Sequence, residues 1–122
     1  TKHKMDSEQM IINEDNARMI NNAKAAGRKV CTVGTSSMKA VETAAIIDNR
    51  VKVFNGWTNK FIFPPYEFAI SDAMITNFHP PLSSMLMQVA AFGGYELIMN
   101  AYKYAIEKKY KFFTYGDAML II

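Results

Sequence analysis

The chain has 122 residues, 50% of them hydrophobic and 20% charged, with 14 basic against 11 acidic side chains and a formal net charge of +3. These fractions are typical of one globular domain and exclude intrinsic disorder as the main state, because disorder needs low hydrophobicity and high charge. The single Cys31 excludes an internal disulfide and a cysteine-cluster metal site, the two histidines argue against a histidine-rich zinc site, and no apolar run approaches the roughly 18–20 residues of a membrane span. We therefore expect no metal and no membrane partner, and the free thiol is compatible with a cytoplasmic location.

The N-terminal segment predicts a short strand followed by a capped helix. Residues 9–12 are typical of a strand, and Asn13 can cap the following helix by accepting a hydrogen bond from its first free amides. Gly27 can end that helix in a left-handed conformation. The inner face of the helix is predicted by residues at helical spacing, namely Ala17, Ile20 and Ala23.

A strand, a turn and a second helix are predicted next. The β-branched run at residues 29–33 predicts a buried strand, and the turn at residues 34–37 interrupts it. A helix to about Ile47 is predicted by the spacing of Met38, Val41, Glu42 and Ala45. Such a strand–turn–helix unit is the ingredient of parallel α/β sheets.

The middle of the chain predicts three more strands and a loop. Residues 51–54 and 60–63 are expected to form strands joined by a hairpin at Asn55-Gly56, and Pro64-Pro65 ends the second. Residues 73–76 predict a short apolar strand. The two prolines of residues 77–81 force the segment after it into a loop.

The C-terminal third predicts two helices and a last strand. Ser83 or Ser84 can cap a helix that reaches Phe92 and is apolar on nearly every side, hence buried. Gly93-Gly94 breaks it, and residues 118–122 predict the last strand. The helix between them is expected to present one stripe made of Tyr95, Ile98, Tyr102 and Ile106. The whole pattern predicts an α/β fold with a mixed or mostly parallel sheet flanked by helices.

The turn at residues 34–37 is the first candidate site. It places the hydroxyls of Thr35, Ser36 and Ser37 with free amides at a helix N-terminus, and such a terminus binds anions. The alternative is that Ser36 or Ser37 caps its own helix. The turn matches neither the Rossmann nor the P-loop glycine pattern, and it is not a nucleophile elbow.

Two further candidates lie in the later loops. His79 follows a strand, at the end where ligands bind in open α/β sheets, and it could exchange a proton near neutral pH. The alternative is a loop histidine bonded to backbone carbonyls. Asp117, in Tyr115-Gly116-Asp117, could face a ligand or could belong to an ordinary turn.

A basic run near the C-terminus permits two interpretations. Four lysines alternate there with tyrosines, which would suit the phosphates of a nucleic acid. The wet face of an amphipathic helix is the favoured alternative, because a basic run carries little specificity. The residues are Lys103, Lys108, Lys109 and Lys111, interleaved with Tyr102, Tyr104 and Tyr110.

Five stretches, in order along the chain, resemble the C-terminal part of the S-adenosylmethionine:tRNA ribosyltransferase-isomerase family of queuosine biosynthesis. They are residues 3–8 (HKMDSE), 33–39 (VGTSSMK), 72–81 (DAMITNFHPP), 91–96 (AFGGYE) and 115–121 (YGDAMLI). The resemblance covers about the last third of a member. It implies that residues 1–122 belong to a larger α/β domain, with the family's inserted β-barrel domain absent. Asp6, Lys39 and Pro80 depart from the usual His, Arg and Leu.

The resemblance implies an enzyme that moves and rearranges the ribosyl group of S-adenosylmethionine onto 7-aminomethyl-7-deazaguanine at the tRNA wobble position, giving epoxyqueuosine. S-adenosylmethionine would be the ribosyl donor, that tRNA the acceptor, and no further cofactor is implied. His79 is the favoured base or proton shuttle and Asp117 the next candidate. The implied substrate-binding residues are Thr35, Ser36, Ser37, Asn77 and Tyr115.

The chain alone is expected to be inactive, since catalysis needs groups held by several elements. The alternative is a non-catalytic binding or structural module. The apolar helix at residues 85–92 and the edge of the strand at residues 118–122 also predict self-association, most simply as a two-fold dimer. Ultracentrifugation at micromolar concentration would test it, and a clean monomer that binds no hydrophobic dye would contradict it.

Overall fold

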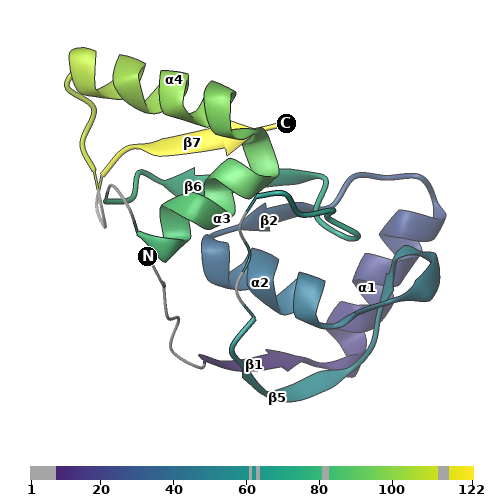
Figure 1. Ribbon diagram of the computed structural model, residues 1–122. Coiled ribbons are helices and arrows are strands. Elements are labelled where there is room, and N and C mark those ends of the chain that lie inside the picture. The colour runs from purple at the N-terminus through teal and green to yellow at the C-terminus, as the bar shows by residue number, and fades with distance from the viewer. Residues whose placement is uncertain (1–7, 61, 63, 81–82, 113–115) are drawn as a thin grey trace.

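A mixed three-stranded sheet forms the centre of the molecule in the computed structural model, which describes residues 8–60, 62, 64–80, 83–112 and 116–122 (Figure 1). Strand β6 (Ala73–Asn77) lies in the middle, parallel to β2 (Cys31–Val33) and antiparallel to β7 (Ala118–Ile121). Ala73, Met74 and Thr76 of this central strand are buried and Ile75 is half-buried, so both of its faces are largely covered, whereas Asn77 at its end is exposed. The expected α/β fold with a mixed sheet is confirmed.

The N-terminal unit has the predicted capping residues. Strand β1 (Glu8–Ile12) leads into α1 (Glu14–Ala25), whose first turn is capped by Asn13, with 2.8 Å between its Oδ1 and the Asn16 amide. The helix ends at Gly27, which has a φ of +74°, while the Arg28 amide donates to the Ala23 carbonyl at 2.9 Å. This is the left-handed ending that glycine favours.

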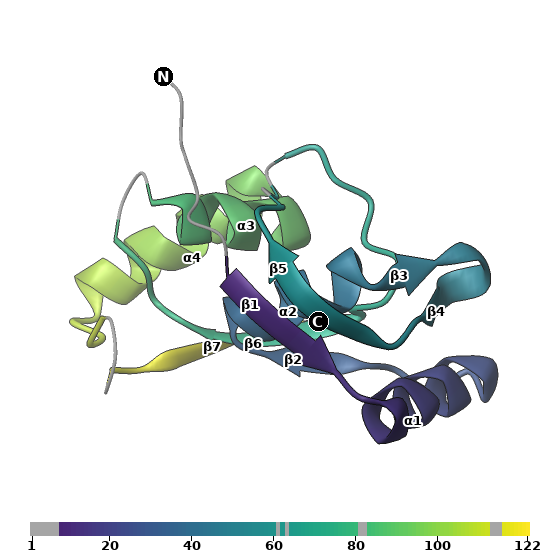
Figure 2. The ribbon, with the colours of Figure 1, turned by 90° about the horizontal axis from the view of Figure 1, so that it is seen from below.

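A two-stranded ribbon lies on the other side of helix α2 (Thr35–Thr43) from the sheet (Figures 1 and 2). It pairs β1 with β5 (Phe54–Thr58), antiparallel, with Met10 opposite Gly56. The hairpin predicted at Asn55-Gly56 is therefore wrong. Both residues lie inside β5, because β1, far away in sequence, supplies the partner strand.

The local hairpin lies earlier in the chain. It pairs β3 (Ala45–Ile46) with β4 (Arg50–Val51) through the short 3-10 turn η1 (Ile47–Asn49). Asp48 and Asn49 have φ of 61° and 54°, a region that these two residue types tolerate. Helix α2 thus ends before residue 47. The strand expected at residues 60–63 falls partly outside the described residues, and Lys60 and Ile62 are not in a strand.

Helices α3 (Ser84–Gly93) and α4 (Tyr95–Glu107) pack against each other and against the sheet (Figure 1). Ser83 caps α3 by accepting from the Leu86 amide at 3.1 Å, and Gly94, with a φ of +90°, separates the two helices. The main core that they share with the sheet is made of Met38, Met74, Phe78, Leu86, Val89, Ala90, Ile98, Tyr102, Ala105 and Ile121.

Three burial predictions need correction. The inner stripe of α4 is Ile98, Tyr102 and Ala105, whereas Tyr95 and Ile106 are exposed, so the buried face is rotated around the helix axis toward Ala105. In β2 only Thr32 is buried, because β2 forms an edge of the three-stranded sheet.

The third correction concerns α3. It buries Leu86, Gln88, Val89 and Ala90, so it is not the uncovered apolar face that the sequence predicted. Met85 is the exposed apolar residue of α3, and further exposed apolar side chains lie on the ribbon at Ile11 and Trp57, on α4 at Leu97, and on β7 at Leu120. Strand β7 is an edge strand of its sheet, so self-association through it stays a prediction.

Two absences concern only the described residues. Within them, no helix is both long and apolar enough to cross a membrane. The same part of the chain holds no group of three histidine, cysteine, aspartate or glutamate side chains placed to bind a metal ion.

Candidate functional site

The sheet topology brings three predicted segments to one edge. Because β2 and β6 are parallel, the turn after β2 and the loop after β6 leave the sheet on the same side, and the Gly34 amide donates to the Ile75 carbonyl at 2.7 Å. Strand β7 is antiparallel and begins where β6 ends, with Ala118 opposite Asn77. The turn at residues 34–37, His79 and Asp117 therefore lie at one edge of the sheet, by which we mean the end where β2 and β6 stop and β7 begins. We call this edge the candidate site. Tyr115 lies outside the described residues.

Glycine is required where β2 turns into α2. Gly34 has φ 93° and ψ 152°, a conformation that is essentially open only to glycine. It is also the N-cap of α2, and no side chain caps the helix. The alternative that Ser36 or Ser37 caps its own helix is wrong. The amides of the first helical turn thus have no side-chain acceptor and could bind an anionic or polar ligand group.

Two residues of this turn are held by other elements. The Ser36 hydroxyl donates to Glu8 Oε2 at 3.0 Å, and the Thr35 carbonyl accepts from Gln88 Nε2 of α3 at 2.7 Å. Gln88 is 1% exposed, so its side-chain amide joins α3 to the turn by a hydrogen bond that is shielded from water. The hydroxyl of Ser36 is therefore committed to Glu8, whereas Ser37 is exposed at the surface.

An ion pair between a buried lysine and a partly exposed glutamate lies beneath the turn. Lys39 is 1% exposed, and its ammonium group binds Glu8 Oε1, the second oxygen of the carboxylate that accepts from Ser36. Burial raises the pKa of Glu8, but the hydrogen bonds from Lys39 and Ser36 and the charge of Lys39 outweigh it and hold that pKa below its usual value. Glu8 was not predicted as a site residue, although it ends the resembling stretch at residues 3–8.

His79 is half-buried and held at two atoms. Its Nε2 lies 2.7 Å from the Thr76 hydroxyl, and its backbone amide donates to the Tyr102 hydroxyl at 2.8 Å. The ring therefore contacts a hydroxyl rather than the carbonyls of the alternative interpretation. Burial lowers the pKa of His79, so the imidazole is neutral near pH 7.

The hydrogen bonds around Thr76 favour one tautomer. Its hydroxyl has one proton and lies 3.3 Å from the Asn77 carbonyl, to which it can donate. Nε2–H of His79 then donates to the Thr76 oxygen, and Nδ1 keeps its lone pair. A neutral ring with a free Nδ1 can act as a base. Neither Thr76 nor Tyr102 was predicted as part of the site.

Asp117 closes a turn. Its Oδ2 accepts from the Lys111 amide at 2.8 Å, and its own amide donates to the Lys111 carbonyl at 2.8 Å. A Cβ on Gly116 would lie 2.6 Å from that carbonyl oxygen, so only glycine fits there. The turn interpretation of Asp117 is confirmed, because its carboxylate accepts from the Lys111 amide within the turn, and its role at the candidate site stays a prediction. Asn77, exposed at the end of β6, lies at the same edge.

The lowered pKa of His79 predicts a pH-dependent stability. Below pH 6.5, the ordinary pKa of histidine, the unfolded chain binds a proton that the folded chain binds less well. The free energy of unfolding should therefore fall as the pH drops from 7.5 to 5.5. Urea unfolding at the two pH values measures this loss, which should be smaller in His79→Gln. In the matched variant His3→Gln the loss should persist, and an equal loss in all three proteins would contradict the prediction.

Comparison with known proteins places these features in a family. Residues 1–121 match the family described as "Queuosine biosynthesis protein". The S-adenosylmethionine:tRNA ribosyltransferase-isomerases of Parabacteroides distasonis and Phocaeicola vulgatus are 61% and 59% identical to the chain over all 122 residues. The chain spans 35% of the length of each.

A solved structure is also similar. The crystal structure of S-adenosylmethionine tRNA ribosyltransferase from Thermotoga maritima superimposes with a TM-score of 0.86 at 39% sequence identity. The match covers 92% of this chain and 39% of that protein. The fold described above is therefore shared with a homologue, including the mixed sheet whose edge forms the candidate site.

Proposed function

Because this chain belongs to the queuosine biosynthesis protein family, we propose that it forms one side of the active site of an S-adenosylmethionine:tRNA ribosyltransferase-isomerase. The observation that carries the proposal is that the uncapped first turn of α2 and the imidazole of His79, held by Thr76, follow the neighbouring parallel strands β2 and β6 at the same end of the sheet. Since the chain spans 35% of its relatives, the remaining groups of the active site would come from the part that it does not span. Residues 1–122 would then be the C-terminal part of a larger α/β domain.

The reaction needs a base and groups that orient two substrates. We propose that Nδ1 of His79 takes the proton from the ribose carbon next to the sulfonium of S-adenosylmethionine, since a neutral imidazole suits proton transfer near pH 7. The open amides of the α2 turn would hold a polar group of a substrate, with Thr35 and Ser37 beside them. Asn77 and Tyr115 would orient the ribose or the 7-aminomethyl-7-deazaguanine base.

Transfer of labelled ribose tests the proposal. The whole-length protein that contains this chain should move the ribose carbons of labelled S-adenosylmethionine into tRNA carrying 7-aminomethyl-7-deazaguanine, with the product nucleoside identified by mass. The 122-residue chain alone should give no such product. Label that stays in S-adenosylmethionine, or a methyl group transferred in place of the ribose, would contradict the proposed activity.

A further inference from the structure

Six exposed residues at the end of α4 form a basic, aromatic surface, which we call the lysine–tyrosine surface. They are Lys103, Tyr104, Lys108, Lys109, Tyr110 and Lys111. We propose that this surface binds the phosphate backbone and unpaired bases of the RNA whose nucleotide enters the candidate site. The inference rests on the proposed function, because it assigns a binding surface to the RNA substrate of that site.

The surface carries four lysines against one exposed carboxylate in the same stretch, that of Glu107, so its charge stays positive. Among the described residues the ion pairs are Arg18–Asp15, Lys24–Asp72 and Lys39–Glu8, and none involves a lysine of this surface. Four exposed ammonium groups within nine positions therefore have no carboxylate partner there. Unpaired cations in such a cluster attract phosphates through counterion release.

Its aromatic rings favour RNA over a simple anion. Tyr104 and Tyr110 are 55% and 43% exposed, and their rings meet edge to face with 6.3 Å between centroids. The ammonium of Lys108 lies 5.7 Å from the Tyr104 centroid. Exposed rings beside cations suit single-stranded nucleic acid, whose bases stack on the rings while its phosphates meet the charges.

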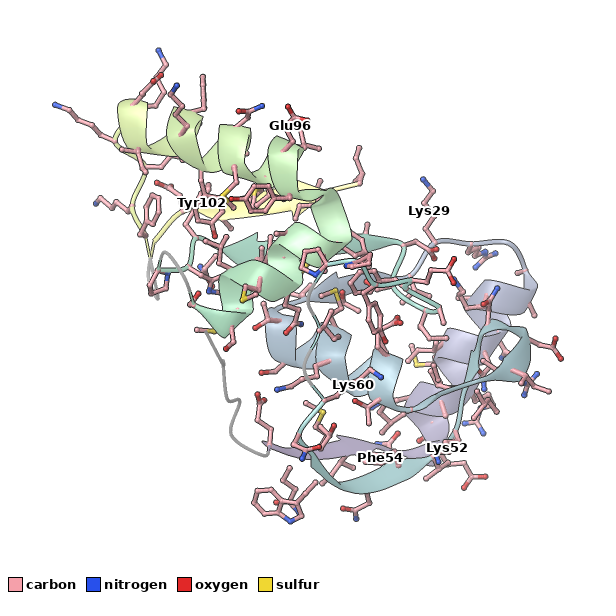
Figure 3. All side chains as sticks on the ribbon, in the orientation of Figure 1. Lys29, Lys52, Phe54, Lys60, Glu96 and Tyr102 are labelled. Carbon is pink, nitrogen blue, oxygen red and sulfur yellow. The ribbon has the colours of Figure 1, made fainter. Side chains whose placement is uncertain are left out.

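The surface is continuous with the candidate site. The ring of Tyr110 packs against Phe78 at 6.0 Å, and Phe78 precedes His79. Lys111 is bonded through its backbone to Asp117. The hydroxyl of Tyr102, on the same helix, holds the His79 amide. Figure 3 shows Tyr102 on the side of α4 that faces β7. An RNA bound at the end of α4 would therefore lie next to the proposed base.

Lys109 gives a means of removing one charge without weakening the fold. Its φ is +62°, and it follows α4 in the position that glycine takes after α1, with the Tyr110 amide donating to the Ala105 carbonyl at 2.9 Å. Glycine adopts this conformation more easily than lysine does. Lys109→Gly should therefore keep or raise the melting temperature while it lowers the affinity for RNA.

A second basic region supplies the matched control. Arg28 and Lys29 line a cavity of about 610 Å³ at the opposite edge of the sheet together with Lys24 and Arg50, and Asp48 and Asp72 reduce the positive charge there. Lys52 lies beyond the neighbouring hairpin, and Figure 3 shows Lys29 and Lys52 far from the end of α4. Neutralising Arg28, Lys29 and Lys52 removes three charges, as does neutralising three lysines of the surface.

The experiment compares RNA affinity in these two triple variants. Fluorescence anisotropy with a labelled anticodon stem-loop RNA is measured across a salt series for the whole-length protein that contains this chain and for its variants. The variant Lys108→Gln/Lys109→Gly/Lys111→Gln should bind roughly tenfold or more weakly, with the slope of log affinity against log salt reduced by about 2–3. The variant Arg28→Gln/Lys29→Gln/Lys52→Gln should change affinity by less than about threefold, since phosphate contacts outside the bound surface are few.

Each outcome bears on the proposal. Equal weakening by the two triple variants would overturn it, because net charge alone would then explain the binding. Unchanged affinity in the surface variant would also overturn it and would point to a protein partner for this surface. The ribose-transfer assay is read separately: RNA binding that depends on the surface, without ribose transfer by the whole-length protein, would reject the proposed activity and keep the surface.

Discussion

Replacing His79 by alanine in the whole-length protein should lower the rate of ribose transfer by roughly 10²–10⁴-fold, the usual contribution of a general base. The imidazole is half-buried, neutral near pH 7, and fixed by Thr76 at Nε2, so only Nδ1 is free to take a proton. The variant should keep its affinity for RNA, because the lysine–tyrosine surface is untouched. Single-turnover kinetics with saturating S-adenosylmethionine would separate the chemical step from binding.

Two controls distinguish a base from a positioning residue. Added imidazole should partly restore the rate of His79→Ala, which a purely structural defect would not allow. Thr76→Val, which removes the hydroxyl partner of Nε2, should cause a smaller loss and alter the pH profile, since Thr76 acts through His79. A near-normal rate in His79→Ala, with a large loss in Asp117→Asn, would transfer the role of base to Asp117.

The sequence identified the separate parts of the candidate site better than their connections. The turn at residues 34–37 and the loop at His79 each follow a strand, and the parallel pairing of these strands brings both to one edge. The contact between Glu8 and Lys39 could not be predicted, because it joins residues 31 positions apart through a strand that pairs elsewhere. Tyr102 was expected on the inner stripe of its helix and among the tyrosines of the basic run, yet its hydroxyl accepts from the His79 amide.

Tertiary pairing explains the errors in the fold. Asn55-Gly56 has the local chemistry of a hairpin turn, but β1 pairs along all of β5 and keeps these residues extended. At Lys109 the error is of the opposite kind. Its backbone has the left-handed conformation of a turn, which a lysine side chain does not predict. Helical spacing predicted the buried residues of α2 well, but on α4 it also included Tyr95 and Ile106, which are exposed. It gave no information on why the charged Glu42 and Lys39 are buried on α2.

Replacing Glu42 by alanine should lower the free energy of unfolding by roughly 3–5 kcal/mol, because it leaves a row of backbone amides without an acceptor. The carboxylate of Glu42 is 4% exposed and accepts from the amides of Ala69, Ile70 and Ser71, at 2.8, 2.8 and 3.0 Å. These three residues lead into β6. The loss is a large fraction of the roughly 5–15 kcal/mol by which a domain is stable, so the melting temperature should fall clearly.

Urea unfolding of Glu42→Ala beside Glu96→Ala measures the effect of the three hydrogen bonds. Glu96 is exposed in the first turn of α4 (Figure 3), so its removal should cost less than about 1 kcal/mol. Glu42→Gln should fall between the two, since its amide keeps one acceptor oxygen but turns an NH₂ group toward a backbone donor. Equal stability of Glu42→Ala and Glu96→Ala would show that water replaces the carboxylate. A larger loss in Glu42→Ala than in Glu96→Ala would show that the loop held by Glu42 fixes β6 and, through β6, the position of His79.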